Sequence, residues 1–260
     1  MCRRAKRQLL NMKDILIVAA TRMAQSEFEM SSKLGVSLRQ LAFDPQMSTS
    51  IVFENDGKNV RGLGTIYNTF LTPAYARYVV LFVHDDVYIH DTFVRYRLNE
   101  AITRFDVVGL AGNKSPDLSQ PSWALKFNED GTYAGWQDKV NLSGAVAHTA
   151  DGGAVSFFGE MPADCELLDG LFLAVNTEKL LQANVKFDPQ FQFHFYDLDF
   201  CRACRQTRTF PRNVAHSGHP CECRNFWLTT MAGGKIAVQG EMAVITLAGP
   251  RYLASQSLAL

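Results

Sequence analysis

The chain has no net charge and no long apolar run. Its 26 basic residues balance its 26 acidic ones, so no strong field favours nucleic acid, and we expect no nucleic-acid partner. A helix that spans a membrane needs about 20 consecutive apolar residues. The apolar stretch at 15–20 is far shorter than that. We therefore expect no transmembrane segment.

The first ten residues lack the apolar core of a secretory signal. They carry a basic cluster at Arg3, Arg4, Lys6 and Arg7, but no apolar region of sufficient length follows it. Such a cluster is more typical of a solvated tail than of a binding arm. We therefore expect a cytoplasmic protein, and the sequence leaves peripheral attachment to a membrane open.

The cysteines are too few to suggest a disulfide scaffold in a chain of this length. The six cysteines, which do not suggest a disulfide framework, are Cys2, Cys165, Cys201, Cys204, Cys221 and Cys223. The spacings Cys201-x-x-Cys204 and Cys221-x-Cys223 fit a zinc ribbon poorly, and the first pair falls in a predicted helix. Reduced thiols are the favoured interpretation, and structural zinc is the alternative.

The residues that are present indicate an α/β domain. Hydrophobic residues make up 47% of the chain and charged residues 20%, so a core of ordinary size can form. Strands are predicted over 14–20, 50–53, 78–83 and 107–110, and the helices between them over 31–43, 64–71 and 91–105. Strands that alternate with helices predict a doubly wound, mostly parallel sheet flanked by helices.

The second half of the chain has a weaker pattern. Its first part, 113–162, is rich in Gly, Ser, Asp, Asn and Pro and predicts irregular loops with short strands at most. Beyond it we expect a strand over 167–175 that is interrupted by Asp169-Gly170, helices over 177–183 and 196–206, and a last strand over 242–247.

Two adjacent carboxylates, Asp85 and Asp86, follow the apolar run 79–83 and His84. Open α/β sheets bind ligands beyond the carboxyl ends of their strands. Mg²⁺ is typically held by one or two carboxylates together with phosphate oxygens, so the pair could hold a cation on a diphosphate. An ordinary turn at the strand end explains the pair equally well.

Three further positions could carry chemistry. Asp197 stands at the start of a predicted helix, where an acid is also a favourable cap, but a histidine and several aromatic residues accompany it. Asp169 lies in an apolar strand and must be hydrogen-bonded, either as a structural acid or as a ligand to a substrate hydroxyl. His216 and His219 lie in a Gly/Pro turn and are either metal ligands or surface histidines.

Taken in order, these segments resemble one family. The motifs are FVHDDV at 82–87, VVGLAG at 107–112, the isolated Trp123, LDGLFLAV at 168–175, FDPQFQFHFYDLDFCR at 187–202 and HSG at 216–218. Together they resemble the family-two type of glycosyltransferase, which implies a GT-A fold with a smaller mixed β region for the acceptor. The resemblance covers roughly 14–220. It implies a basic tail over 1–13, one domain over 14–224 with nucleotide-binding and acceptor-binding halves (14–112 and 113–224), and an extension over 225–260.

The resemblance also assigns roles. It implies an inverting transfer from a nucleotide-diphospho-sugar, UDP-linked, to a glycan, lipid-linked or protein acceptor, with Asp197 as the general base. The metal, Mn²⁺ or Mg²⁺, would be bound by Asp86 and His216. The other implied contacts are to the nucleotide or donor sugar (Thr21, Arg22, Glu54, Asn55, Asp85 and Asp169) and to the acceptor (Trp123, His194 and Tyr196).

The chain departs from the common family pattern at two positions. His84 precedes the two acids where acids at alternate positions are usual, and Tyr196 precedes the base where a glutamate is usual. Other functions also stay open. They are a non-catalytic protein that binds nucleotide-sugars or carbohydrate, and a nucleotidyltransferase, which the lack of a Gly-rich loop with a following basic residue disfavours.

Overall fold

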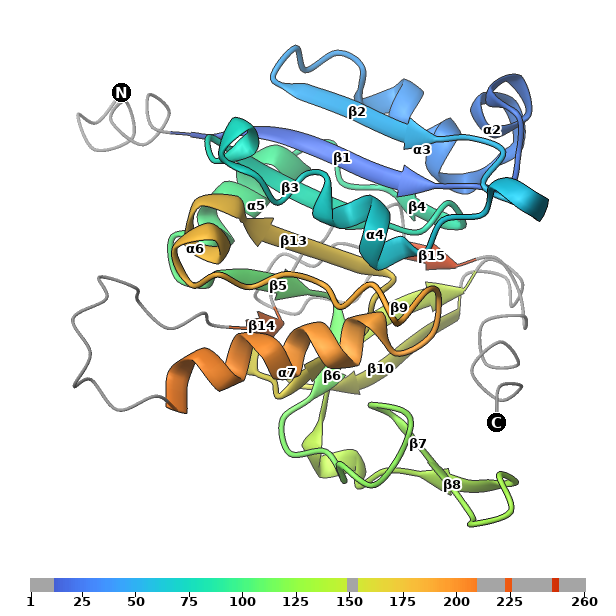
Figure 1. Ribbon diagram of the computed structural model, residues 1–260, viewed down its shortest axis with the longest axis vertical. Coiled ribbons are helices and arrows are strands. Elements are labelled where there is room, and N and C mark those ends of the chain that lie inside the picture. Colours follow the sequence, from blue (N-terminus) through green and yellow to red (C-terminus); the bar gives the residue numbers. More distant parts are fainter. Residues whose placement is uncertain (1–11, 149–153, 210–222, 226–244, 248–260) are drawn as a thin grey trace.

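The computed structural model describes residues 12–148, 154–209, 223–225 and 245–247 (Figure 1). A seven-stranded sheet forms its centre, in the order β11-β14-β5-β13-β3-β1-β2. The strands are β1 (Asp14–Ala20), β2 (Met47–Val52), β3 (Tyr78–Val83), β5 (Val107–Gly109), β11 (Ala163–Asp164), β13 (Phe172–Asn176) and β14 (Cys223–Asn225). β1, β3 and β13 are almost entirely apolar because both faces of the sheet are covered there.

The expected α/β class is confirmed, but the sheet is mixed rather than mostly parallel. β1 is parallel to β2 and β3, and β14 to β5, whereas β13 is antiparallel to both β3 and β5. The reason is where the chain enters β13. It arrives at the carboxyl end of β3, where the His84 amide donates to Leu171 O at 3.0 Å, so it can only run back along β3.

Helices cover both faces of this sheet. α4 (Leu63–Asn68), α6 (Thr177–Gln182) and α7 (Tyr196–Thr209) lie in front of it in the view of Figure 1, and α3 (Lys33–Leu41) and α5 (Val94–Ile102) lie behind it. α2 (Gln25–Ser31) packs on α3. Short 3-10 turns occur at η1 (Gly57–Asn59), η2 (Pro73–Tyr75) and η3 (Lys139–Asn141).

A second sheet draws two of its strands, β9 and β10, from the region 113–162, where we expected irregular loops with short strands at most. Its order is β12-β6-β9-β15-β4, with β10 also paired to β9. Its strands are β4 (Val87–Ile89), β6 (Ala111–Asn113), β9 (Leu142–His148), β10 (Ala154–Gly159), β12 (Leu167–Leu168) and β15 (Ile245–Leu247), and a separate hairpin consists of β7 (Leu125–Phe127) and β8 (Tyr133–Trp136). β9 was not predicted because Gly144 interrupts its apolar pattern, and glycine is uncommon inside strands. At Gly144 φ is +119°, and a Cβ atom would lie 2.2 Å from Leu110 O.

The element boundaries follow the sequence closely where apolar runs end abruptly. β1 and β3 span the predicted ranges, and the strand predicted over 167–175 is interrupted at Asp169-Gly170 because β12 and β13 belong to different sheets. The helix predicted over 91–105 is shorter, and Asp91 lies in the turn before it. Its Oδ1 accepts from the Phe93 amide at 2.7 Å, and the helix begins at Val94.

An aromatic cluster fills the core between the main sheet and the helices in front of it. The Tyr67 ring stacks on Phe82 with centroids 4.4 Å apart, and Phe187 stacks on Phe200 at 4.1 Å. The Tyr196 ring meets both Tyr67 and Phe187 edge-on or tilted, at 5.8 and 5.9 Å. These rings therefore join β3, α4 and the start of α7 in one rigid unit.

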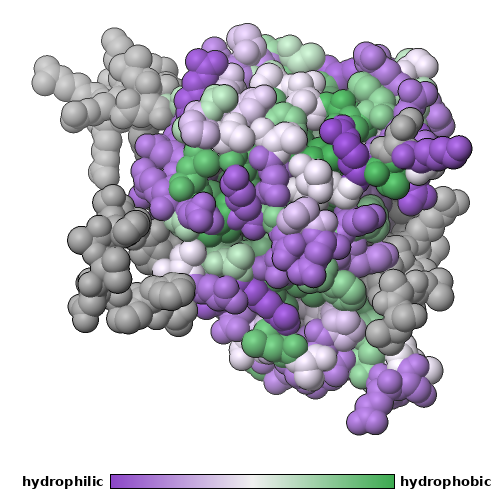
Figure 2. Space-filling model, in the orientation of Figure 1, coloured by the Kyte–Doolittle hydropathy of each residue, from purple (hydrophilic) through white to green (hydrophobic). Residues whose placement is uncertain are grey.

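The outer surface on this side is mixed in character. Figure 2 shows hydrophilic side chains over most of the visible face, with apolar ones in small separate areas. Among the helices that the structure describes, none has the length and apolar character needed to cross a membrane.

Candidate functional site

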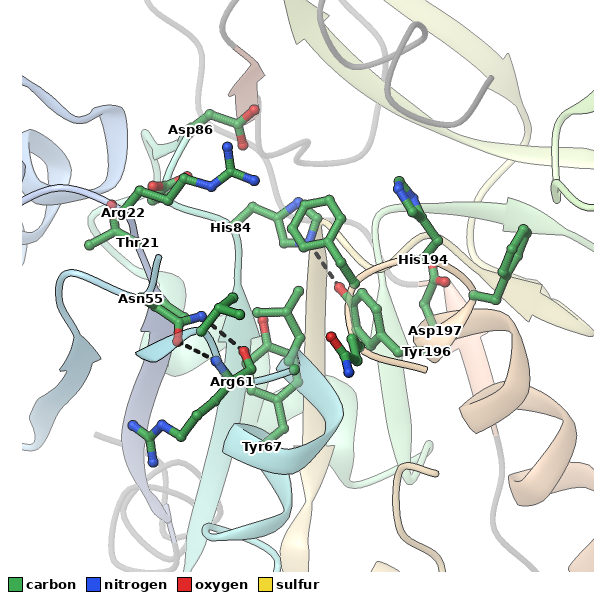
Figure 3. Close-up of a pocket in the computed structure, with 18 of the residues that line it drawn as sticks. Thr21, Arg22, Asn55, Arg61, Tyr67, His84, Asp86, His194, Tyr196 and Asp197 are labelled. Atoms are coloured by element: carbon green, nitrogen blue, oxygen red, sulfur yellow. Dashed lines mark hydrogen bonds between the residues drawn. The ribbon is translucent and has the colours of Figure 1, made fainter. Parts of the chain in front are cut away.

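One cavity of about 510 Å³ lies where the carboxyl ends of β1 and β3 meet the start of α7 (Figure 3). Eight of the residues predicted from the sequence line it: Thr21, Arg22, Asn55, Asp85, Asp86, His194, Tyr196 and Asp197. Arg61, Tyr67 and His84 also line it. Segments far apart in the sequence therefore meet at the strand ends, as expected for an α/β sheet.

Asp86 lies at the end of β3 with one carboxylate oxygen unsatisfied. Its Oδ1 is buried and has no hydrogen-bond partner within the described ranges. Burial raises the pKa of Asp86, and the neighbouring Asp85 raises it further, while His84 opposes the rise. A buried carboxylate oxygen without a partner is costly, so this wall of the cavity is suited to an incoming cation.

Asp197 occupies the first turn of α7 and is only 7% exposed. Its Oδ2 accepts from the Gly170 amide at 2.8 Å and its Oδ1 from the Leu198 amide at 2.9 Å. Burial raises the pKa of Asp197 to about 7, and the nearby Asp169 adds to the rise. A carboxylate with this pKa can accept a proton near neutral pH.

Tyr196 joins the two acidic segments. Its hydroxyl donates to Gly170 O at 2.9 Å and lies 2.8 Å from His84 Nε2 (Figure 3). Phe195, directly before the helix, has φ of +65°, which is uncommon for a residue with a Cβ atom. Strain of this kind is found where the surrounding structure requires it, often at functional sites.

Two predicted residues, Trp123 and Asp169, lie behind the cavity rather than in its lining. The Trp123 indole donates to Asp169 Oδ2 at 2.6 Å, and the Leu171 amide donates to Asp169 Oδ1 at 2.8 Å. Asp169 is 1% exposed and Trp123 is 5% exposed. This arrangement corresponds to the structural alternative for Asp169, because both of its oxygens are engaged.

The loop after β2 forms the opposite wall. The Asn55 amide group is engaged at both ends by the Arg61 backbone, donating to its O at 2.9 Å and accepting from its N at 2.8 Å. Asn55 N also donates to Thr21 O at 2.8 Å. Arg22 and Arg61 are exposed and form no ion pair in the described part of the chain. Glu54, with φ of +51°, is exposed and lies outside the lining.

The expected metal ligands are described only in part. His216 falls outside the described residues, as does Cys221. Within 12–148, 154–209 and the two short strands, no group of three His, Cys, Asp or Glu side chains is placed to hold a metal. Asp86 and Asp85 still fit a cation that takes its other ligands from phosphate and water. Cys201 and Cys204 are buried in α7, and Cys201 Sγ accepts from Leu168 N, so these two have a packing role.

Three residues that shape the cavity could not be identified from the sequence pattern. Arg61 lies in a loop whose course depends on Asn55, and Tyr67 lies in a short helix with an ordinary apolar pattern. Gly170 is the third. A Cβ there would lie 2.3 Å from the Tyr196 hydroxyl oxygen and 2.9 Å from Asp197 Cβ. The only available signal was the Asp-Gly break inside an apolar strand.

Fold and site together define an α/β protein with a cavity at its strand ends that is lined by three aspartates, Asp85, Asp86 and Asp197. No family model matches the chain, and no curated protein matches it. Among solved structures, A197 from STIV is similar at 10% identity with a TM-score of 0.39, over 72% of this chain and 78% of that one. HddC from Yersinia pseudotuberculosis is similar at 13% identity with a TM-score of 0.28, over 73% and 85%. At these TM-scores neither likeness supports an assignment.

Proposed function

We propose that the protein is a metal-dependent, inverting glycosyltransferase of GT-A type that uses a nucleotide-diphospho-sugar. One observation carries the proposal: Asp86, with an unsatisfied oxygen, and Asp197, with a pKa near 7, line the same cavity. A site for glycosyl transfer needs a place for the cation and diphosphate beside a base. The order of motifs in the sequence supports the same class.

Asp197 is the proposed general base. It accepts the proton of the acceptor hydroxyl while that oxygen forms a bond to the anomeric carbon of the donor sugar. The bond from the anomeric carbon to the diphosphate breaks, and its electron pair leaves with the nucleoside diphosphate. Because no enzyme side chain forms a bond to the anomeric carbon in this reaction, the single displacement inverts the anomeric centre.

Asp86 is the proposed protein ligand of the cation, with Asp85 beside it. When bound, Mn²⁺ or Mg²⁺ supplies positive charge that stabilises the departing diphosphate. His216 stays a predicted further ligand. Arg22 and Arg61 are exposed in the lining and are free to contact phosphate, for which guanidinium groups are well suited.

The remaining lining residues divide between donor and acceptor in this proposal. Thr21 and Asn55 contact the nucleoside part of the donor, which is UDP-linked in the first test, and His194 contacts the acceptor. The acceptor is a glycan, a lipid-linked sugar or a protein. We place the reaction in the cytoplasm, and at a membrane surface if the acceptor is lipid-linked.

A thermal-shift screen of nucleotide-diphospho-sugars with and without Mn²⁺ tests donor class and metal dependence together. We expect the melting temperature to rise with one donor class only when Mn²⁺ is present, and Asp86→Asn to lose this rise. Glu129→Gln, an exposed acid remote from the lining, is the control and should keep it. Any donor found is then tested for release of nucleoside diphosphate.

Two outcomes would contradict the proposal. A metal-dependent rise without transfer or hydrolysis would indicate a non-catalytic binding protein. No response to any donor, with or without Mn²⁺, would remove nucleotide-sugars as ligands.

A further inference from the structure

We propose that Tyr196 is a positioning residue: its hydroxyl holds Gly170 through the carbonyl oxygen, and the amide of the same residue orients the Asp197 carboxylate. The inference rests on the proposed function for its catalytic meaning, although the positioning itself does not depend on it. It also gives a role to His84 and Tyr196, the two positions at which the chain departs from the common family pattern.

Gly170 is held at both its carbonyl and its amide by neighbouring residues of α7. Its carbonyl oxygen accepts from the Tyr196 hydroxyl at 2.9 Å, and its amide donates to Asp197 Oδ2 at 2.8 Å. The two groups belong to the peptide planes on either side of the Gly170 Cα, so a displacement of Gly170 that breaks one contact disturbs the other. Asp197 therefore keeps one of its two backbone donors only while Gly170 stays in place.

His84 completes the chain of contacts. A carbonyl oxygen can only accept, so the single proton of the Tyr196 hydroxyl must go to Gly170 O. His84 Nε2, 2.8 Å from the same hydroxyl oxygen, must then be the donor. This assigns the Nε2-protonated ring to His84. The His84 amide also donates to Leu171 O at 3.0 Å, so His84 contacts the 169–171 segment directly through its backbone and, by way of Tyr196, through its ring.

Packing leaves the Tyr196 ring no alternative position. The side chain is 2% exposed and lies against the Tyr67 and Phe187 rings. Gly170 allows the close approach, since any Cβ there would overlap the hydroxyl. Burial raises the pKa of Tyr196 well above its usual value, so the hydroxyl keeps its proton as a donor.

A glutamate at this position could not perform the same task. An ionised carboxylate only accepts hydrogen bonds and would face Gly170 O without a proton to donate. It would also place a third negative charge beside Asp197 and the buried Asp169. A neutral phenol that donates is therefore the side chain that this particular Gly170 geometry requires.

Kinetics of Tyr196→Phe test the inference at the level of activity. We expect kcat to fall roughly tenfold or more while KM for the donor changes less than twofold, because the base loses its orientation but the cavity keeps its shape. The rising limb of the pH–rate profile should move to higher pH, since a looser Gly170 amide stabilises the carboxylate less. Tyr78→Phe, which removes one exposed hydroxyl bond to Arg77 at the other end of β3, should change neither value.

Substitutions of His84 separate a hydrogen-bond role from packing. A glutamine places an amide donor close to the position of Nε2, whereas a leucine fills the space without a donor. We expect His84→Gln to retain several-fold more kcat than His84→Leu. Equal losses in the two variants would remove His84 from the chain of contacts.

A readout without substrate distinguishes this inference from the proposed function. In protein labelled with ¹⁵N-glycine, the Gly170 amide shift should titrate with the pKa of Asp197, and Asp197→Asn should abolish that titration. In Tyr196→Phe we expect the titration to shrink by half or more and amide exchange to accelerate. An unchanged Gly170 titration would overturn the inference even if the enzyme transfers sugar. A lost titration would support it even if no donor is ever found.

Discussion

Two aspartates line the same cavity but differ in the hydrogen bonds that their carboxylates accept. Asp197 has each oxygen occupied by a backbone N–H, whereas Asp86 Oδ1 is buried without a partner in the described structure. Burial raises the pKa of both. Asp197 is therefore held in a fixed direction, whereas Asp86 has a free oxygen that can bind a cation.

The elements that carry the two residues explain the contrast. Asp197 stands in the first turn of α7, where amide groups have no partner within the helix, and it receives the Leu198 amide there. Asp86 follows a strand whose amides are used in pairing with β13 and β1. The helix start therefore supplies one donor to the Asp197 carboxylate and Gly170 supplies the other, whereas the strand end leaves Asp86 Oδ1 without one.

The largest effect should come from Asp197→Asn. An amide has nearly the same shape but cannot take the proton, so we expect kcat to fall by about 10³-fold while donor affinity stays within about threefold. Steady-state kinetics and calorimetric titration with the donor measure the two quantities. Asp199→Asn, in the same helical turn but outside the lining, is the matched control. Turnover close to wild type in the Asp197 variant would eliminate it as the base.

Changing the pH should reveal the raised pKa of Asp197 in two opposite trends. Below a pKa of about 7 the base is protonated, so kcat/KM should fall by about tenfold per pH unit and reach roughly 100-fold at pH 5. Stability should move the other way. The folded state holds a proton between pH 4 and 7 that the unfolded state releases, so the free energy of unfolding falls as pH rises through this window.

Urea unfolding of wild type and Asp197→Asn measures the second trend. A pKa change of about three units corresponds to roughly 4 kcal/mol at most, and the asparagine variant should lack that slope. Identical slopes in the two proteins would mean that Asp197 titrates at its ordinary pKa.

Asp86→Asn tests whether Asp86 is the ligand of the cation. The variant keeps its shape but loses the charge that attracts a cation, so the affinity for Mn²⁺ with donor should fall about tenfold to 100-fold. Without metal the two proteins should bind the donor equally. Titration of Mn²⁺ at fixed donor concentration tests this, and an equal affinity for Mn²⁺ would assign the cation to other residues.

The sequence was sufficient where a single segment determines the outcome. The apolar runs of β1 and β3 predicted their boundaries, and the acids after β3 and at the start of α7 indicated two of the segments that line the cavity. Relations between segments could not be predicted. The direction of β13 depends on a turn at 169–171, and the Trp123–Asp169 contact joins residues in different parts of the fold. Neither feature produces a local periodicity in the sequence from which it could be predicted.

The smallest effect on activity should come from Trp123→Phe. This variant tests whether Trp123 and Asp169, which lie behind the cavity, have a purely structural role. Phenylalanine keeps an aromatic ring against Phe158 but removes the N–H that Asp169 Oδ2 accepts. A buried carboxylate that loses a donor costs about 1–3 kcal/mol, which unfolding experiments would detect. We expect kcat and donor affinity to change less than threefold, because Asp169 keeps the Leu171 amide and Asp197 keeps both of its own donors. A selective rise in KM for the acceptor, with stability unchanged, would return Trp123 to the acceptor site that the sequence assigned to it.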